Sequence, residues 1–181
     1  MVFNIGINDL GVDYDSYVVW YSMLRRCYSA VYQQGKPTYI GTTVSPDWHW
    51  LSNFDQWFQK NYIQDWQLDK ELLSNFSKVY SKDTCCFLPN EINSALYFDR
   101  GKNGLPPGVS YKTSNQNYIA QYSRKDEHGK RKSVHLLSSS DPQKCFQAYK
   151  VAKENYLKEL ADRFQAKLDP RAYRALMELK I

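Results

Sequence analysis

The segment 101–107 constrains the fold of this chain more than any other stretch. It reads Gly-Lys-Asn-Gly-Leu-Pro-Pro. Its glycines and paired prolines cannot hold the hydrogen bonding of a helix or a strand interior, which predicts a linker. We therefore expect two domains, one over residues 1–100 and one over residues 108–181. A chain of 181 residues can bury one moderate core or two small ones, so each domain has to be small.

The composition excludes a disordered chain and favours an anionic partner. Hydrophobic residues make up 43% of the chain, an ordinary fraction for a globular protein. Fifteen Tyr, eight Phe and five Trp suit small modules that build a core from a few large side chains. The formal net charge of +5 favours an anionic partner, although many proteins without one carry as much charge.

The sequence argues against a membrane partner and against a zinc site. No apolar run approaches the roughly 20 residues that span a bilayer, and the first residues lack a basic and then apolar signal region. We therefore expect a cytoplasmic protein with no membrane partner. Cys27, Cys85, Cys86 and Cys145 lack the paired spacing of zinc ligands, so we expect reduced, buried thiols.

The first hundred residues alternate short helical and extended patterns. Large apolar residues recur at three-and-four spacing from Tyr17 to Tyr28, which predicts a helix over 16–30. The pattern after it predicts, in order, a loop over 33–37, a strand over 38–44, a turn over 45–47, a helix capped by Asn53, a strand ending at Asp69 and a short helix over 89–96.

The second part predicts three strands followed by helices, an α+β class. The strands are expected over 108–112, 117–124 and 132–137, with a polar turn over 125–129 between the last two. A long helix is expected to start near Pro142, because a proline in the first turn needs no hydrogen-bond donor. Asp169 and Pro170 restart a final helix.

A series of residues in the first domain occurs in a distinctive order. The residues are Trp20, Met23, Leu24, Arg26, Cys27, Tyr28, Pro37, Thr38, Tyr39, Gly41, Trp57, Phe58, Leu68, Asp69, Lys70, Tyr80, Ser81, Cys85, Ile92 and Asn93. On these residues the domain resembles a group of phage HNH-type proteins, which includes homing endonucleases. The resemblance implies a small ββα-metal domain: a strand ends in an acidic residue, a loop and second strand follow, and a helix completes a site for one divalent metal.

The resemblance implies a magnesium site at Asp69 and Asn93, with Asp69 and Lys70 as the catalytic positions. Lys70 stands where the group's catalytic His belongs, and Thr84 where a loop Asn belongs. Lys70 could be a base if burial lowered its pKa strongly, a phosphate contact, or a solvated structural residue. Asp69 could instead bond nearby backbone amides, and Asn93 could bond a loop. One carboxylate and one amide make a weak Mg²⁺ site unless DNA phosphates complete it.

Four short motifs stand out in the second domain: Gly108-Val109-Ser110, Tyr118-Ile119-Ala120, His135-Leu136 and Phe146-x-Ala148-Tyr149. On these motifs the domain is similar to the DNA-binding domain of plant ethylene-response factors (APETALA-type). The resemblance implies a three-stranded antiparallel sheet that packs on a long helix and docks in the major groove of double-stranded DNA. By strand alternation, the residues expected to face DNA are Ser110, Lys112, Gln121, Ser123, Ser133 and His135.

The basic residues of the hairpin in this domain have two possible roles. Arg124, Lys125, Lys130, Arg131 and Lys132 could contact phosphates, or they could form a solvated hairpin. The plant domains use mainly Arg and Trp on the DNA-facing side, where this chain has Ser and Gln. Direct readout of bases is therefore expected to be weaker here.

Departures from the HNH pattern leave two main functional hypotheses. The group usually has Gly-Asn where this chain has Phe76-Ser77, and Lys82 replaces a turn Pro. The first hypothesis is a phage-type DNA-binding protein with metal-dependent nicking or cleavage, acting in the cytoplasm of an infected bacterium. The second is a non-enzyme on the same scaffold, which acts as a DNA-binding regulator or as an inhibitor of a host defence protein. An RNA-binding module is a third.

Overall fold

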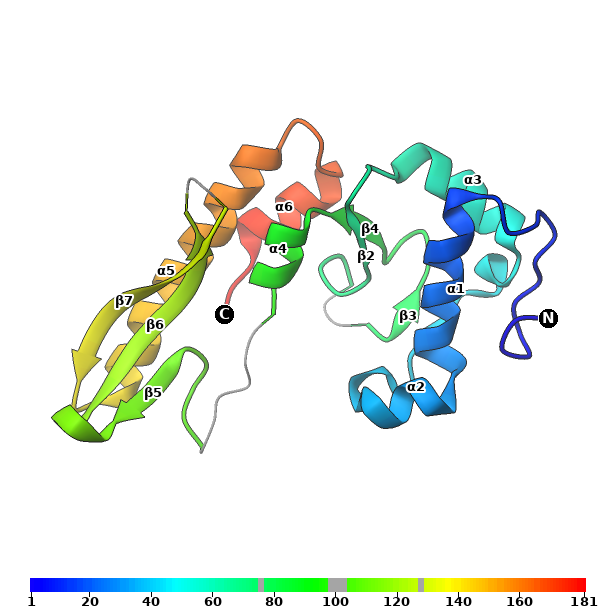
Figure 1. Ribbon diagram of the computed structural model, residues 1–181. Coiled ribbons are helices and arrows are strands. Elements are labelled where there is room, and N and C mark those ends of the chain that lie inside the picture. The colour runs from blue at the N-terminus through cyan, green and yellow to red at the C-terminus, as the bar shows by residue number, and fades with distance from the viewer. Residues whose placement is uncertain (75–76, 98–103, 127–128) are drawn as a thin grey trace. The chain divides into compact units, whose positions relative to one another are not determined.

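The computed structural model describes residues 1–74, 77–97, 104–126 and 129–181. It divides into two compact units, Met1–Pro89 and Asn90–Ile181 (Figure 1). The expected linker over 101–107 lies partly outside the described residues, as do Phe76 and the tip of the expected turn over 125–129. The chain mixes helix and strand, which confirms the α+β class. No helix of the described residues is long and apolar enough to cross a membrane.

The described residues of the first unit form three α-helices and two short strand pairs. Strands β1 and β3 pair in parallel, and β2 and β4 pair antiparallel. Two turns of 3-10 helix, η1 (Pro37–Tyr39) and η2 (Pro46–His49), connect these elements. The other bounds are α1 (Asp15–Tyr28), α2 (Ala30–Gly35), β1 (Thr43–Val44), α3 (Leu51–Asn61), β2 (Gln67–Asp69), β3 (Val79–Tyr80) and β4 (Cys86–Leu88).

The core of the first unit is aromatic. Trp20 on α1 is fully buried, and its indole Nε1 donates a hydrogen bond of 2.7 Å to the carbonyl oxygen of Trp48. The ring of Trp48 meets Phe54 of α3 edge to face, with centroids 5.0 Å apart. Met23, Leu24 and Cys27 of α1 are also buried, so the three-and-four stripe is confirmed.

Three local expectations for this unit were wrong. The helix α3 begins at Leu51 rather than after Asn53. The side-chain amide of Asn53 instead donates a hydrogen bond of 3.0 Å to the carbonyl oxygen of Asp47. The expected strand over 38–44 is reduced to its last two residues, because η1 occupies its start. The expected loop over 33–37 is partly helix α2, which the Ser29 hydroxyl caps by accepting from the Tyr32 amide.

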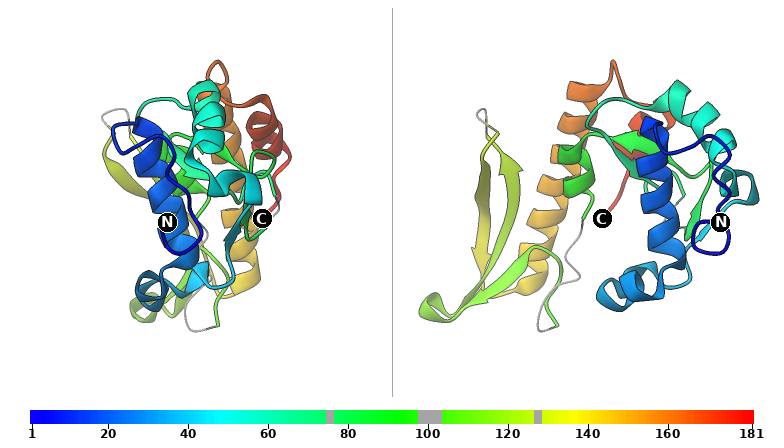
Figure 2. Two further views of the ribbon diagram at one scale, coloured as in Figure 1. Left: turned by 90° about the vertical axis from the view of Figure 1, so that its right-hand side faces the viewer. Right: turned by 45° about the vertical axis from the view of Figure 1, so that its right-hand side comes forward.

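The second unit contains the expected three-stranded antiparallel sheet, in the order β5, β6, β7. Helix α5 packs against β6 and β7, and Figure 2 shows it running along the sheet. A bulge at Leu136 shifts the register between Ala120 and Gln121. The bounds are α4 (Asn90–Ala95), β5 (Val109–Lys112), η3 (Thr113–Asn115), β6 (Asn117–Lys125), β7 (Arg131–Ser139), α5 (Pro142–Phe164) and α6 (Pro170–Glu178).

Side-chain caps and ion pairs hold the helices of this unit. Asp141 caps α5 by accepting from the Gln143 amide at 2.8 Å, and Pro142 occupies the first turn as expected. Helix α4 is tied to α5 through Glu91, which accepts from the Tyr156 hydroxyl at 3.0 Å and pairs with Arg163 at 2.7 Å. These bonds explain why α4 belongs to the second unit.

All four cysteines are free and buried, which confirms the expectation of reduced, buried thiols. Burial raises the pKa of the Cys27 thiol and of the Cys85 thiol to about 12. The Cys145 thiol of α5 lies 3.4 Å from the carbonyl oxygen of Tyr118.

Gly108 is the tightest point of the second unit. Its φ is +71°, and a Cβ built there would lie 2.0 Å from Cδ2 of the Tyr149 ring.

We expect Gly108→Ala to lower the free energy of unfolding by about 2–4 kcal/mol, because backbone strain and overpacking add. Urea unfolding measures this loss. The control is Gly129→Ala, at φ +74° with no atom within 4 Å, where strain alone applies. Equal losses in the two variants would contradict the role of the Tyr149 contact.

Candidate functional site

The chain order at the implied metal site is strand, strand, helix. Asp69 ends β2 and pairs with Cys86 of β4, and α4 follows β4 along the chain. Asn93 lies on α4 and therefore belongs to the second unit, whereas Asp69 and Lys70 belong to the first. The two implied ligands thus come from separate units of the structure.

The Asp69 carboxylate serves the turn that follows β2. Its Oδ1 accepts hydrogen bonds from the backbone amides of Glu71, at 3.0 Å, and Leu72, at 2.9 Å. Burial raises the pKa of this carboxyl above its ordinary value. The geometry matches the alternative in which a strand-end Asp bonds nearby backbone amides.

Lys70 is buried rather than solvated. Only 6% of the residue is exposed, and its Nζ lies 3.0 Å from Oε1 of Glu71. The same Nζ lies 5.7 Å from the centre of the Tyr80 ring. The lysine charge is therefore compensated within the first unit, by its neighbour in sequence and by an aromatic ring.

Thr84, at the position of the loop Asn, also serves local structure. Its Oγ1 accepts from the Ser81 amide at 3.0 Å and donates to the carbonyl of Val79 at 2.7 Å. In the described part of the chain, no three His, Cys, Asp or Glu residues come together as a group that could hold a metal. One carboxylate bonded to two amides does not by itself fit the octahedral oxygen set that Mg²⁺ requires.

The residues expected to face DNA do lie on one face of the sheet. Gln121 pairs with His135, and Ser123 pairs with Ser133, so their side chains share a side. All six expected residues are exposed, and the Ser133 hydroxyl lies 3.4 Å from Oε1 of Gln121. Strand β5 adds the remaining two, Ser110 and Lys112.

The basic hairpin residues divide between the two sides of the sheet. Lys125 pairs with Arg131 and continues the side that carries Ser123 and Ser133. We name this exposed surface the polar sheet face. Its residues are Ser110, Lys112, Gln121, Ser123, Lys125, Arg131, Ser133 and His135.

Arg124 and Lys132 pair on the opposite side of the sheet, each beside an acidic residue. Arg124 lies 5.5 Å from the centre of the Tyr156 ring and 3.8 Å from Glu159. Lys132 pairs with Asp126 at 3.0 Å. The backbone amide of exposed Lys130 bonds Asp126 at 2.8 Å, within the turn. Arg124 and Lys132 are therefore poorly placed to extend the polar sheet face.

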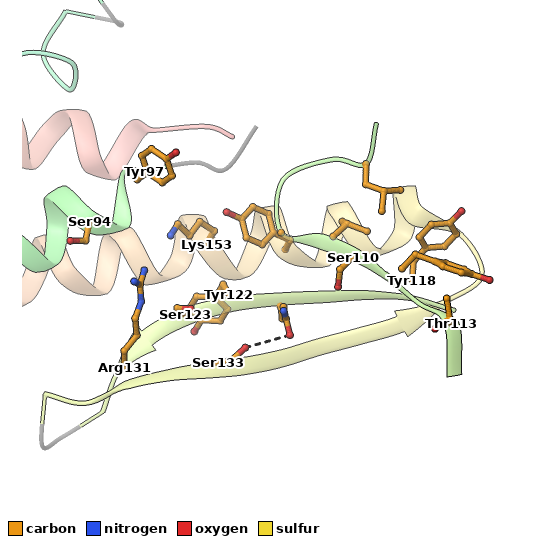
Figure 3. A pocket seen from close by; sticks show the side chains of 16 residues that line it. Ser94, Tyr97, Ser110, Thr113, Tyr118, Tyr122, Ser123, Arg131, Ser133 and Lys153 are labelled. Carbon is orange, nitrogen blue, oxygen red and sulfur yellow. Dashed lines mark hydrogen bonds between the residues drawn. The ribbon is translucent and has the colours of Figure 1, made fainter. Parts of the chain in front are cut away.

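A hollow of about 1110 Å³ adjoins the polar sheet face, where β5 ends and β6 continues with β7 as its one neighbouring strand among the described residues (Figure 3). Arg131 of β7 and Lys153 of α5 extend into it from its two sides. Its lining is otherwise rich in hydroxyl groups. The lining residues are Ser94, Tyr97, Leu105, Gly108, Val109, Ser110, Tyr111, Thr113, Tyr118, Gln121, Tyr122, Ser123, Arg131, Ser133, Tyr149 and Lys153.

Lys153 is a site residue that the sequence reasoning missed. It is only 6% exposed, and burial together with the positive charge of Arg131 lowers its pKa to about 8. Its position carried a signal: it stands four residues after Tyr149 and three before Tyr156, on the buried stripe of α5. A lysine is seldom buried on such a stripe unless its charge is paired.

No family model, no curated protein and no solved structure matches this chain. The interpretation of the implied metal site and of the polar sheet face therefore rests on their own chemistry and on the motif resemblances described above.

The buried Lys153 predicts a pH dependence of stability. Its folded pKa of about 8 lies below the ordinary 10.5, so the unfolded chain binds more protons between these values. The free energy of unfolding of the wild type should therefore rise, relative to Lys153→Met, by at most about 3 kcal/mol from pH 8 to pH 10.5. Urea unfolding of both proteins at several pH values measures the difference. Parallel pH profiles would contradict the burial of a charged Lys153.

Proposed function

We propose that the chain is a double-stranded-DNA-binding protein that docks its polar sheet face in the major groove. The supporting observation is that the six expected residues, with Lys125 and Arg131, share one exposed face while α5 packs on the other. The similarity to the ethylene-response-factor domain points to the same face. The major groove, about 12 Å wide, accepts a β-ribbon.

The chemistry of this face suits modest sequence preference and strong backbone attraction. Lys112, Lys125 and Arg131 supply charge for phosphates. Gln121 has the amide that pairs with adenine, while the serine hydroxyls accept or donate to several bases. We therefore expect binding that depends steeply on salt and discriminates weakly among sequences.

We propose further that the first unit is a nuclease-type scaffold whose site has become structural. Three of its key positions serve local structure: Asp69 caps a turn, Lys70 pairs with Glu71, and Thr84 closes a loop. A protein of this kind would act as a DNA-binding regulator. If a host protein has replaced DNA as partner, it would act as an inhibitor of host defence.

The second candidate function is magnesium-dependent nicking of DNA. The order β2, β4, α4, with Asp69 at the end of β2, favours it. In that case DNA phosphates would have to complete the coordination of the Mg²⁺ ion, because the protein ligands alone are too few.

The binding proposal predicts that positive charge on the polar sheet face contributes more to DNA affinity than positive charge elsewhere on the second unit. The double variant Lys112→Ala/Lys125→Ala should weaken binding to a 20-base-pair duplex about tenfold and reduce the salt slope by roughly 2. Fluorescence anisotropy over a salt series measures both. The control, Lys132→Ala/Lys144→Ala, removes the same net charge outside the polar sheet face and should change much less. Equal effects would refute docking through this face, and preference for single-stranded RNA over the duplex would favour the RNA-binding alternative.

Nicking is tested with Asp69→Asn, which keeps an oxygen that can accept from the amides of Glu71 and Leu72. Supercoiled plasmid is incubated with wild type or variant in Mg²⁺ or Mn²⁺ and resolved on a gel. We expect neither protein to nick the plasmid. Nicking by the wild type that the variant loses would establish the second candidate instead.

A further inference from the structure

We propose that the first unit binds DNA through phosphate contacts on a surface of its own. This surface is formed by the end of α1, by α2 and η1, and by the residue before β3. We name it the cation–tyrosine surface. The inference rests on the proposed function for its ligand, DNA, but it concerns different residues in the other unit. The residues of the surface are Arg25, Arg26, Tyr32, Lys36, Tyr39 and Lys78.

The surface takes most of its positive charge from a stretch of chain without acidic residues. Residues 16–46 contain Arg25, Arg26 and Lys36 but no Asp or Glu. In the described part of the chain, none of these three cations forms an ion pair with a carboxylate. The two residues of this unit that lie outside the described ones are an Asn and a Phe, which carry no charge.

Lys78 adds a fourth cation to the surface. Its Nζ donates a hydrogen bond of 2.9 Å to the carbonyl oxygen of Ile40, the residue that follows η1. A carboxylate also acts on the surface, since Glu71 interacts electrostatically with Tyr39. Lys70 balances the charge of Glu71 at 3.0 Å. The surface therefore keeps a net positive charge, which favours a polyanion as partner.

Two guanidinium groups and two tyrosine rings form a row on this surface. Cζ of Arg25 lies 5.0 Å from the centre of the Tyr32 ring, and the centres of the Tyr32 and Tyr39 rings are 5.9 Å apart. Cζ of Arg26 lies 5.9 Å from the centre of the Tyr39 ring. A guanidinium over a ring keeps the N–H groups at its edge, which can donate to two phosphate oxygens at once. Arg25 is exposed, so a phosphate can reach it in this way.

Gln33 holds the parts of the surface together before any ligand binds. Its side-chain Nε2 lies 3.1 Å from the carbonyl oxygen of Arg26, 2.7 Å from that of Cys27 and 3.3 Å from that of Tyr39. The Gln33 amide thus satisfies carbonyl groups at the end of α1 and ties η1 to them. Binding does not have to order these segments, which lowers its entropic cost.

The positions of Lys36 and Lys78 point to a ligand rather than to the helix alone. Cations in the last turn of a helix stabilise its C-terminus, which accounts for Arg25 and Arg26 without any partner. Lys36 and Lys78 lie outside α1, and both are exposed. DNA carries a row of phosphates along each strand, so cations from several segments fit it better than a small anion with one charge.

The test compares charge removal on this surface with equal charge removal elsewhere in the full chain. Arg25→Gln/Lys36→Gln removes two cations of the surface. The control, Lys60→Gln/Lys144→Gln, removes two exposed cations outside it and outside the polar sheet face. Fluorescence anisotropy over a salt series measures the affinity for the 20-base-pair duplex and for a single strand of the same length.

We expect Arg25→Gln/Lys36→Gln to raise the Kd of the duplex about tenfold and to reduce the salt slope by roughly 2, because two phosphate contacts are lost. The control should change the Kd less than twofold. If thermal unfolding shows that Arg25→Gln/Lys36→Gln is less stable than the control, Lys36→Gln/Lys78→Gln replaces it with the same expectation. That variant leaves the contact between Arg25 and the Tyr32 ring in place.

The outcomes separate this surface from the proposed function. Weaker duplex binding by Arg25→Gln/Lys36→Gln, with no effect of Lys112→Ala/Lys125→Ala, supports the cation–tyrosine surface and contradicts docking through the polar sheet face. The reverse pattern supports the polar sheet face and refutes the cation–tyrosine surface. Weakening of the single strand alone supports the cation–tyrosine surface and assigns it to an unpaired DNA strand. Equal effects of the variant and its control refute it, and so does a wild type that binds neither probe.

Discussion

The contact between Gly108 and the ring of Tyr149 governs the arrangement of the second unit. Because the chain passes the ring without a Cβ and at positive φ, it can enter β5 directly above α5. Strand β5 then covers only residues 117–120 of β6. The rest of β6 keeps an open edge, and the hollow with Lys153 lies there. One close approach thus determines how much of β6 is covered by β5.

Two lysines of the described residues are buried, one in each unit. Lys70 lies beside a carboxylate and an aromatic ring, which compensate its charge within the first unit. Lys153 lies on the buried stripe of α5, where burial and the positive charge of Arg131 lower its pKa to about 8. The lysine at the position that resembles a nuclease motif is thus the one beside a carboxylate of its own unit.

Sequence patterns predicted the sheet and its helix because each pattern there is local. Alternation along β6 and β7 determines which side chains share a face, and Pro142 marks the start of α5. The errors arose where tertiary contacts override local preference. Trp50 rather than Asn53 precedes α3, and η1 shortens the strand before Thr43. Strand register decides which basic hairpin residues share the polar sheet face, and it is not visible in a local pattern. The lowered pKa of Lys153 depends in part on Arg131, which is distant in the sequence.

The buried thiols give each unit its own chemical reporter. Cys27, Cys85 and Cys86 lie in the first unit, and Cys145 lies in the second, beneath the sheet. A thiol with a raised pKa in a packed core is almost inert to alkylating reagents until its surroundings open. The rate at which each cysteine becomes modified therefore reports how often its own unit opens. Alkylation kinetics can follow the two units separately in one intact, unlabelled chain.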